Sequence, residues 1–275
     1  MTDDAETAVT RGETTPVLRR DRGGVATLTL NRPGAYNPLS TEMMTALQAA
    51  FDEIGRDRSV AVVLLRAEGK GFCAGHDLKE MQAHRNDPDR GEAFYQALFG
   101  QCARLMAGIA ALPQPVIAAV QGTAAAAGCQ LVATCDLAVA GRDARFGVNG
   151  IDVGFFCSTP MVALSRNIGA KKAFELLTTG RLMPAEEAQT AGLVNRVVDD
   201  AELDTASQEL AVAIAAKSAA VIALGKQAFH RQLELDRETA YDFTGKVMIR
   251  NLMMRDAEEG FAAFIEKRRP KWENR

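Results

Sequence analysis

The sequence is poor in the residues that bind metals and form structural disulfides. It has three histidines, scattered along the chain, and five cysteines, an odd number with no Cys-x-x-Cys pair. It also lacks the His-Glu-x-x-His motif, the Walker A loop and the dinucleotide-binding Gly-x-Gly-x-x-Gly motif. We therefore expect no metal and no bound cofactor. Free thiols in a reducing compartment, the cytoplasm, are the simplest account of the cysteines.

Positive charge is not in excess, and long apolar runs are missing. The formal net charge is −3 and the isoelectric point is about 5.8, whereas a nucleic-acid-binding surface is expected to be basic. Polar residues interrupt every apolar run well before the roughly 20 residues that a membrane span needs. Residues 1–15 are acidic and polar, unlike a signal or transit peptide, and predict a disordered tail. We expect neither a nucleic-acid nor a membrane partner.

Two stretches of the chain share the order of buried strand, turn of small residues and helix. The first runs from the apolar segment Val60–Leu65 into GKGFCAGHDLKEM, and the second from Val116–Val120 into a Gly- and Ala-rich turn that opens a helix near Ala126. Small residues let the backbone approach a ligand closely, and a helix N-terminus presents unpaired N–H groups with partial positive charge. Two such turns that converge would offer a pair of donors to a developing oxyanion.

The rest of the chain predicts an α/β core followed by helices. A hairpin is expected around Gly23-Gly24, and a helix over Met43–Ile54 begins behind an N-cap at Ser40 or Thr41. Strands then alternate with helices over the first 200 residues. From residue 202 onward we expect helices only, the first one continuous from Leu203 to about Phe229. The predicted organisation is a core over 16–201 and a helical region over 202–275.

Several segments match one known family in their order along the chain. They are LNRPGAYNPLS from Leu30, FCAGHDLKEM from Phe72, PQPVIAAVQG from Pro113, CQLVATCDLAVA from Cys129, AQTAGLVNRVV from Ala188 and AFIEKRRPKW from Ala263. On these segments the chain resembles the crotonase (enoyl-CoA hydratase/isomerase) superfamily over nearly its whole length. The segments GVN at Gly147 and FCSTP at Phe156 resemble the branch named enoyl-CoA hydratase domain-containing protein 3.

The resemblance implies a fold, an assembly and a substrate class. The fold is a ClpP-like β-β-α spiral core with a C-terminal helical trimerisation region, in a homotrimer or a hexamer that is a dimer of trimers. The substrate is an acyl-CoA thioester, and CoA is part of that substrate rather than a separate cofactor. Because one fold hosts many reactions, the reaction itself has to be argued from the site.

The resemblance also implies two backbone donors for the thioester oxygen. The first is the N–H of His76, which follows Gly75, and the second is the N–H of Ala127, where the family usually has the middle glycine of a Gly-Gly-Gly run. The imidazole of His76 is a separate question. Histidine titrates near neutral pH, so the side chain is a candidate acid or base, and some decarboxylases of the superfamily carry histidine here. We expect the imidazole instead to be packed, with only its backbone used.

The catalytic carboxylates of the family are missing. Hydration needs a base for water and an acid for the α-carbon, and the two glutamates that hydratases of this family use fall on Gln130 and Gly150. Neither residue exchanges a proton near neutral pH. Restoring both glutamates is expected to raise hydration, provided that the loop accommodates the larger side chains.

Three residues near Gly150 are candidate substitutes for the lost groups. Asp152 lies two residues further on, and Cys157 and Ser158 place a thiol beside a hydroxyl in the loop before Pro160. A structural interpretation is favoured for the last two. Cys157 is then a small buried apolar residue, and Ser158 is an N-cap of the next helix.

Contacts to CoA are implied by the resemblance alone. They fall on the loop Asn31–Asn37, on the first of the two turns, and on the C-terminal tail; the residues are Arg32, Ala35, Ala74, Gly75, Asp77, Leu78, Lys79, Phe264 and Lys267. Lys267 has an alternative role, as part of a solvated helix end whose charge complements the helix dipole.

Two classes of function follow from these residues. The first is an enzyme, a lyase by family label, that acts on an acyl-CoA thioester through an enolate-like intermediate held by the N–H groups of His76 and Ala127. Ordinary hydratase activity is not expected, because both glutamates are absent, and decarboxylation or hydrolysis of the thioester is the enzymatic alternative. The second class is a non-catalytic acyl-CoA-binding protein that keeps the scaffold. Product formation with a panel of acyl-CoAs discriminates between the two.

Overall fold

The computed structural model describes residues 15–275, so the tail expected over 1–15 lies outside the described residues except for Thr15. The strands are β1 (Val17–Arg22), β2 (Val25–Leu30), β3 (Val62–Ala67), β4 (Val116–Val120), β5 (Thr123–Ala125), β6 (Leu137–Gly141), β7 (Arg145–Gly147), β8 (Met183–Pro184) and β9 (Arg196–Val198). The α-helices are α1 (Thr41–Arg56), α2 (Leu78–Ala83), α3 (Glu92–Ala111), α4 (Ala127–Thr134), α5 (Pro160–Asn167), α6 (Ala170–Thr179), α7 (Ala185–Ala191), α8 (Leu203–Ala215), α9 (Ala219–Gln232), α10 (Arg237–Leu252) and α11 (Arg255–Ile265). Short 3-10 turns are η1 (Pro33–Ala35), η2 (His84–Asn86), η3 (Asn149–Val153) and η4 (Asp200–Glu202).

The strands form two sheets. The larger has six strands in the order β1-β2-β3-β4-β6-β9, and β5, β7 and β8 form a second sheet of three strands. The expected hairpin is confirmed: β1 and β2 pair antiparallel, and Gly23 and Gly24 occupy its turn with φ of +59° and +79°, which favours glycine. All other pairs in the large sheet are parallel. The α/β prediction is therefore confirmed.

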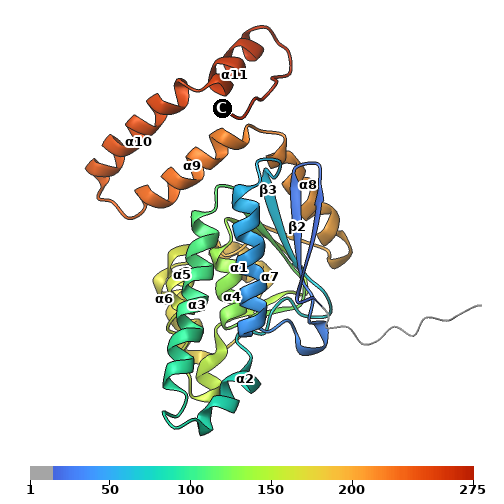
Figure 1. Ribbon diagram of the computed structural model, residues 1–275, viewed down its shortest axis with the longest axis vertical. Coiled ribbons are helices and arrows are strands. Elements are labelled where there is room, and N and C mark those ends of the chain that lie inside the picture. Colours follow the sequence, from blue (N-terminus) through green and yellow to red (C-terminus); the bar gives the residue numbers. More distant parts are fainter. Residues whose placement is uncertain (1–14) are drawn as a thin grey trace, which may run out of the picture.

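Helices cover both faces of the large sheet, as Figure 1 shows. On one face, α1, α3 and α4 pack around the main core; the predicted helix behind Ser40 is confirmed, and the Ser40 hydroxyl accepts a hydrogen bond from the N–H of Met43. On the other face, Leu203 and Ala211 of α8 pack against strand side chains such as Ile117. Because both faces are buried, β4 is apolar at every position, as expected for a parallel strand.

The single helix expected over Leu203 to Phe229 is wrong. The chain forms two helices, α8 and α9, which are bent by 102° relative to each other. Ser218 lies at the break, where its hydroxyl accepts a hydrogen bond from the N–H of Val221 and caps α9. A serine that bonds to the backbone ahead of it favours a helix start over a helix interior. The expectation of helices only after residue 202 is confirmed.

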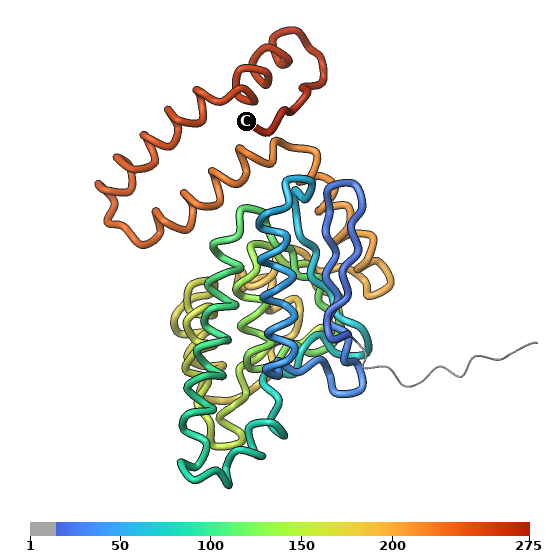
Figure 2. The backbone as a smooth tube through the Cα atoms, viewed as in Figure 1, coloured from blue at the N-terminus to red at the C-terminus, as the bar shows by residue number. Residues whose placement is uncertain are grey.

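Beyond this bend, α9, α10 and α11 form a helical arm that extends away from the sheet, as the backbone trace in Figure 2 makes clear.

One buried ammonium group connects this helical arm to the core. Lys226 of α9 is only 8% exposed, and its Nζ donates to the carbonyls of Ile109 (2.9 Å) and Gln114 (3.0 Å) and to Asp136 Oδ2 (2.6 Å). All three ammonium protons therefore have acceptors. Asp136 Oδ2 also accepts from the N–H of Val116, at the start of β4.

Within residues 15–275, no single helix is both long and apolar enough to cross a membrane; the segment Asp200–Ala215 reaches that length and composition only together with α9, across their bend.

Candidate acyl-CoA site

The two turns of small residues converge in the structure. Backbone hydrogen bonds join them: Cys73 N–H donates to the Thr123 carbonyl (3.1 Å), and Ala125 N–H donates to the Cys73 carbonyl (2.9 Å). Gly75, with φ of +93°, lies against the second turn. A Cβ at this position would come within 2.9 Å of Ala126 Cβ and 3.1 Å of Ala127 N. Glycine is therefore required here for both its backbone conformation and its size.

This convergence brings two unpaired N–H groups together. Within residues 15–275, neither the N–H of His76 nor that of Ala127 donates a hydrogen bond to a protein acceptor. For Ala127 the reason is its place in α4, because the first N–H groups of a helix have no intrahelical partner. Two unpaired donors beside one cavity form an arrangement suited to an oxyanion.

Ala126, which lies between β5 and α4, has a strained backbone conformation that the sequence did not reveal. Its φ is +48° and its ψ is −118°, a conformation that glycine adopts easily and alanine does not. Its N–H is held by the carbonyl of Gly147 at 2.8 Å. Strain of this kind costs about 1–3 kcal/mol and clusters at functional sites.

The strain predicts an unusual response to mutation. We expect Ala126→Gly to raise the free energy of unfolding by about 1 kcal/mol, because the strain relieved exceeds the entropy cost of a glycine. Ala133→Gly, inside α4, is the control and should lower the free energy of unfolding by about 1 kcal/mol or more. Denaturant unfolding measures both. Equal losses in the two variants would show that Ala126 is not strained.

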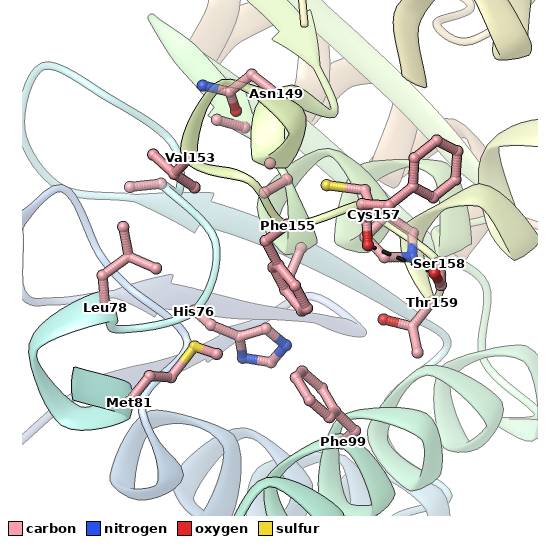
Figure 3. Close-up of a pocket in the computed structure, with 17 residues that line it drawn as sticks. His76, Leu78, Met81, Phe99, Asn149, Val153, Phe155, Cys157, Ser158 and Thr159 are labelled. Carbon is pink, nitrogen blue, oxygen red and sulfur yellow. Dashed lines mark hydrogen bonds between the residues drawn. The ribbon is translucent and has the colours of Figure 1, made fainter. Parts of the chain in front are cut away.

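The two N–H groups open onto a cavity of about 380 Å³. It is lined by Ala74, His76, Leu78, Met81, Phe99, Ala125, Ala126, Ala127, Asn149, Gly150, Val153, Phe155, Phe156, Cys157, Ser158, Thr159 and Pro160. The lining is mostly apolar, and none of these residues is an aspartate or a glutamate. Figure 3 shows the polar ends of His76, Asn149 and Thr159 around this space. An apolar cavity with few polar groups fits an acyl chain.

The His76 side chain lies in the cavity wall, half buried. Its Nδ1 is 3.2 Å from the Leu39 carbonyl oxygen, and its ring meets the Phe99 ring edge to face at 5.5 Å. Burial lowers the pKa of the imidazole, while the bond to Leu39 and the charge of Glu80 oppose this shift in part. The ring is therefore neutral at neutral pH.

Neither replacement for the family's glutamates supplies a proton carrier. Gln130 is buried in α4 but does not line the cavity; its Oε1 lies 4.0 Å from the Cys102 thiol on α3. Gly150 lines the cavity without a side chain. A Cβ there would lie 2.8 Å from Cys157 Sγ and closer still to the Phe155 carbonyl oxygen. The condition that the loop accommodates a glutamate at Gly150 is therefore not met.

The structure separates the three candidate substitutes. Asp152 is exposed, and its carboxylate lies against Gly180 at the end of α6, outside the cavity lining. Cys157 lines the cavity, where burial raises the pKa of its thiol and keeps it protonated. Ser158 also lines the cavity, but it is not the expected N-cap: Thr159 holds that position at α5. The peptide N–H and the hydroxyl of Ser158 both bond to the Phe156 carbonyl two residues back, so the hydroxyl is engaged in the turn.

Most residues expected to contact CoA lie near the first turn. Ala74 and Leu78 line the cavity, and the Asp77 carboxylate caps α2 by accepting from the N–H of exposed Lys79. The loop that carries Arg32 and Ala35 is held beside them. Its anchor is Asn37, which is fully buried.

Asn37 bonds the loop to the segment before Cys73. Its Nδ2 donates to the carbonyls of Glu68 (2.9 Å), Gly71 (3.1 Å) and Phe72 (3.2 Å), and the Tyr36 carbonyl accepts from the N–H of Ala74. Arg32 Nη1 donates to the Ser40 hydroxyl at 3.3 Å. The sequence alone did not indicate this anchoring role.

The two expected tail contacts lie elsewhere. Phe264 is 86% exposed on α11, and Lys267 follows that helix. Figure 1 shows α11 and α2 at opposite ends of the molecule. Within one chain, the structure therefore does not bring either residue to the cavity.

Sequence reasoning missed several residues of the cavity lining, among them Phe99, Asn149, Phe155 and Thr159. Phe99 and Phe155 stack with ring centroids 5.9 Å apart, one from α3 and one from the loop after η3. Their segments are far apart in the sequence, so periodicity could not pair them. Within the described part of the chain, no group of three or more His, Cys, Asp or Glu residues has the arrangement of a metal site.

Comparison with known proteins identifies the family of this chain. The family model described as enoyl-CoA hydratase/isomerase matches residues 20–275. The chain is 42% identical to human enoyl-CoA hydratase domain-containing protein 3, mitochondrial, over 94% of this chain and 84% of that protein. Its structure resembles that of an enoyl-CoA hydratase from Mycobacterium smegmatis, with a TM-score of 0.89 and 54% identity over 94% of this chain and 98% of the other.

The solved structure of human enoyl-CoA hydratase domain-containing protein 3 is also similar. Its TM-score is 0.89 at 41% identity, over 94% of this chain and all of the other. The predicted crotonase fold and the predicted branch are thus confirmed. The chain belongs to the enoyl-CoA hydratase/isomerase (crotonase) family, in the branch of enoyl-CoA hydratase domain-containing protein 3.

Proposed function

We propose that the protein binds acyl-CoA thioesters and holds the thioester oxygen between the N–H groups of His76 and Ala127. The observation that carries this proposal is the pair of unpaired N–H groups beside one apolar cavity. The acyl chain would lie against the apolar lining. The CoA portion would lie beside Arg32, Ala35 and Lys79, next to the first turn. Membership in the family supports an acyl-CoA ligand.

The chemistry of such a site is stabilisation of an enolate-like intermediate. Each oxyanion donor is typically worth about 2.7–4 kcal/mol in the transition state, and an enzyme of the lyase class is the first candidate. Decarboxylation and hydrolysis of the thioester use the same donors. A non-catalytic binding protein would bind the thioester without forming any product.

Binding of the carbonyl is tested by comparing a butanoyl-CoA thioester with the S-butyl-CoA thioether, which lacks the oxygen. Two N–H donors at about 0.5–1.5 kcal/mol each predict a preference for the thioester of about 5- to 150-fold, measured by calorimetry. Ala127→Pro removes one donor, because proline has no backbone N–H, and should reduce this preference. No detectable binding of any acyl-CoA at millimolar concentration would refute the proposal.

We also propose that the chain forms a homotrimer or a dimer of trimers through the helical arm. Exposed apolar side chains gather on α9, α10 and α11: Phe229, Leu233, Tyr241, Met248, Ile249, Leu252, Met253, Phe261, Phe264 and Ile265. A surface this apolar favours burial against neighbouring copies. Light scattering should give three or six times the chain mass of 29.5 kDa. A monomer at micromolar concentration would contradict the assembly.

The cytoplasm is the proposed location of this chain. All five cysteines are free and buried, which fits a reducing compartment. The names of the human and Xenopus laevis relatives place those proteins in mitochondria. Fractionation of the native host followed by immunodetection distinguishes a cytoplasmic from an organellar location.

A further inference from the structure

One nitrogen in the cavity wall has a lone pair and no partner. His76 Nε2 is buried and makes no hydrogen bond within residues 15–275. The other ring nitrogen, Nδ1, faces the Leu39 carbonyl, which can only accept. In a neutral imidazole one nitrogen carries the hydrogen and the other a lone pair. The hydrogen is therefore on Nδ1, and Nε2 is an unprotonated base.

Packing holds this base in place. The Phe99 ring meets the imidazole edge to face at 75°, and Phe99 in turn stacks on Phe155. Figure 3 shows the imidazole between Met81, Phe99 and Phe155. A buried acceptor without a donor typically costs about 1–3 kcal/mol. A ligand with a proton to give would remove that cost.

Among residues 15–275, no other base competes for the same proton. No carboxylate of this part of the chain lines the cavity, and burial keeps the Cys157 thiol protonated. The charged group that acts on His76, Glu80 of α2, is engaged by the N–H and hydroxyl of Thr41. Because burial also lowers the pKa of His76, its base form is present at neutral pH.

We propose that His76 Nε2 takes a proton from the α-carbon of the bound acyl-CoA. The proposal rests on the binding mode proposed above. As the C–H bond breaks, its electron pair forms the double bond between the α-carbon and the carbonyl carbon, and the carbonyl oxygen becomes an enolate oxygen. The N–H groups of His76 and Ala127 hold that oxygen, while the proton converts the imidazole to imidazolium.

The reverse transfer completes a balanced cycle. The imidazolium returns a proton either to the α-carbon, which gives exchange, or to the γ-carbon of a β,γ-unsaturated chain, which shifts the double bond. Both outcomes need one base and no water, and this cavity offers one base. A single residue then supplies the oxyanion donor through its backbone and the base through its ring. This role differs from the packed imidazole that the sequence favoured.

The experiment uses two probes with the full chain. Butanoyl-CoA in deuterium oxide reports α-proton exchange as a mass increase, and but-3-enoyl-CoA reports the shift as a gain of conjugated-thioester absorbance even if the same proton returns. We expect the wild type to catalyse one or both. The rate should rise with pH through a pKa below the ordinary value for histidine and then level off, since only neutral His76 is a base.

His76→Gln separates the two roles of this residue, because it keeps the backbone N–H. We expect it to lower both rates by about 10²- to 10⁴-fold while the dissociation constant for butanoyl-CoA stays within about threefold. His84→Gln is the matched control and should change neither rate, because His84 lies outside the cavity, paired with Asp87 and stacked on Phe94. Binding by the wild type with neither reaction, or unchanged rates in His76→Gln, would overturn the proposal. Failure of the wild type to bind butanoyl-CoA would instead refute the binding mode beneath it.

Discussion

The wild-type protein is expected to hydrate but-2-enoyl-CoA far more slowly than a hydratase with two glutamates. Each general acid or base typically contributes about 10²- to 10⁴-fold, so the deficit should be at least about 10²-fold. Gln130 lies against Cys102, Gly150 has no side chain, and the Asp152 carboxylate lies outside the cavity lining. Loss of the conjugated enoyl-thioester absorbance measures the rate. A glutamate-bearing hydratase of the same family, assayed in parallel, is the control.

The structure also changes the result expected when both glutamates are restored. A glutamate at Gly150 would press its Cβ against Cys157 Sγ and the Phe155 carbonyl, and one at Gln130 would add a buried carboxyl outside the cavity lining. We therefore expect Gln130→Glu with Gly150→Glu to gain no hydration. A wild type that hydrates but-2-enoyl-CoA at ordinary enzyme rates would contradict this account. Cys157 and Asp152 would then be the first residues to mutate.

Lys226→Met is expected to lower the free energy of unfolding by about 3–5 kcal/mol. The substitution removes the ammonium partner of partly buried Asp136, which among residues 15–275 keeps only the N–H of Val116 and Nε2 of His230, and removing one partner of a buried ion pair typically costs that much. It also leaves the Ile109 and Gln114 carbonyls without this donor. Burial lowers the pKa of Lys226, whereas the charge and hydrogen bond of Asp136 raise it. The carboxylate therefore helps to keep the buried amine charged.

Lys246→Met is the matched control for this prediction. Lys246 pairs with Asp242 four residues earlier on α10, but both side chains are exposed, at 73% and 67%. An exposed pair contributes little to stability. Denaturant unfolding should therefore separate the two variants clearly. Similar small effects in both would show that Lys226 does not hold the helical arm to the core.

The sequence predicted the parts of this protein that local pattern determines. The hairpin at Gly23-Gly24, the apolar strand Val116–Val120 and the cap at Ser40 each depend on a few neighbouring residues, and each is confirmed. The order of elements and the family followed from segments that are contiguous in the chain. The resemblance to that family indicated His76 and Ala127, and both residues line one cavity in the structure.

The features that the sequence did not predict depend on contacts between distant segments. The bend at Ser218 arises because α8 must lie on the sheet while α9 leaves it. The stacked pair of Phe99 and Phe155, the unpaired His76 Nε2 and the lack of room for a side chain at Gly150 each require coordinates from two or more elements. Side chains that meet only after folding leave no periodic signal in the chain.

A structure of the protein with butanoyl-CoA bound tests the central claim most directly. The account predicts that the thioester oxygen lies about 2.7–3.1 Å from both His76 N and Ala127 N, with the α-carbon facing His76 Nε2. A thioester oxygen that contacts neither nitrogen, in a complex with the acyl chain in this cavity, would contradict it.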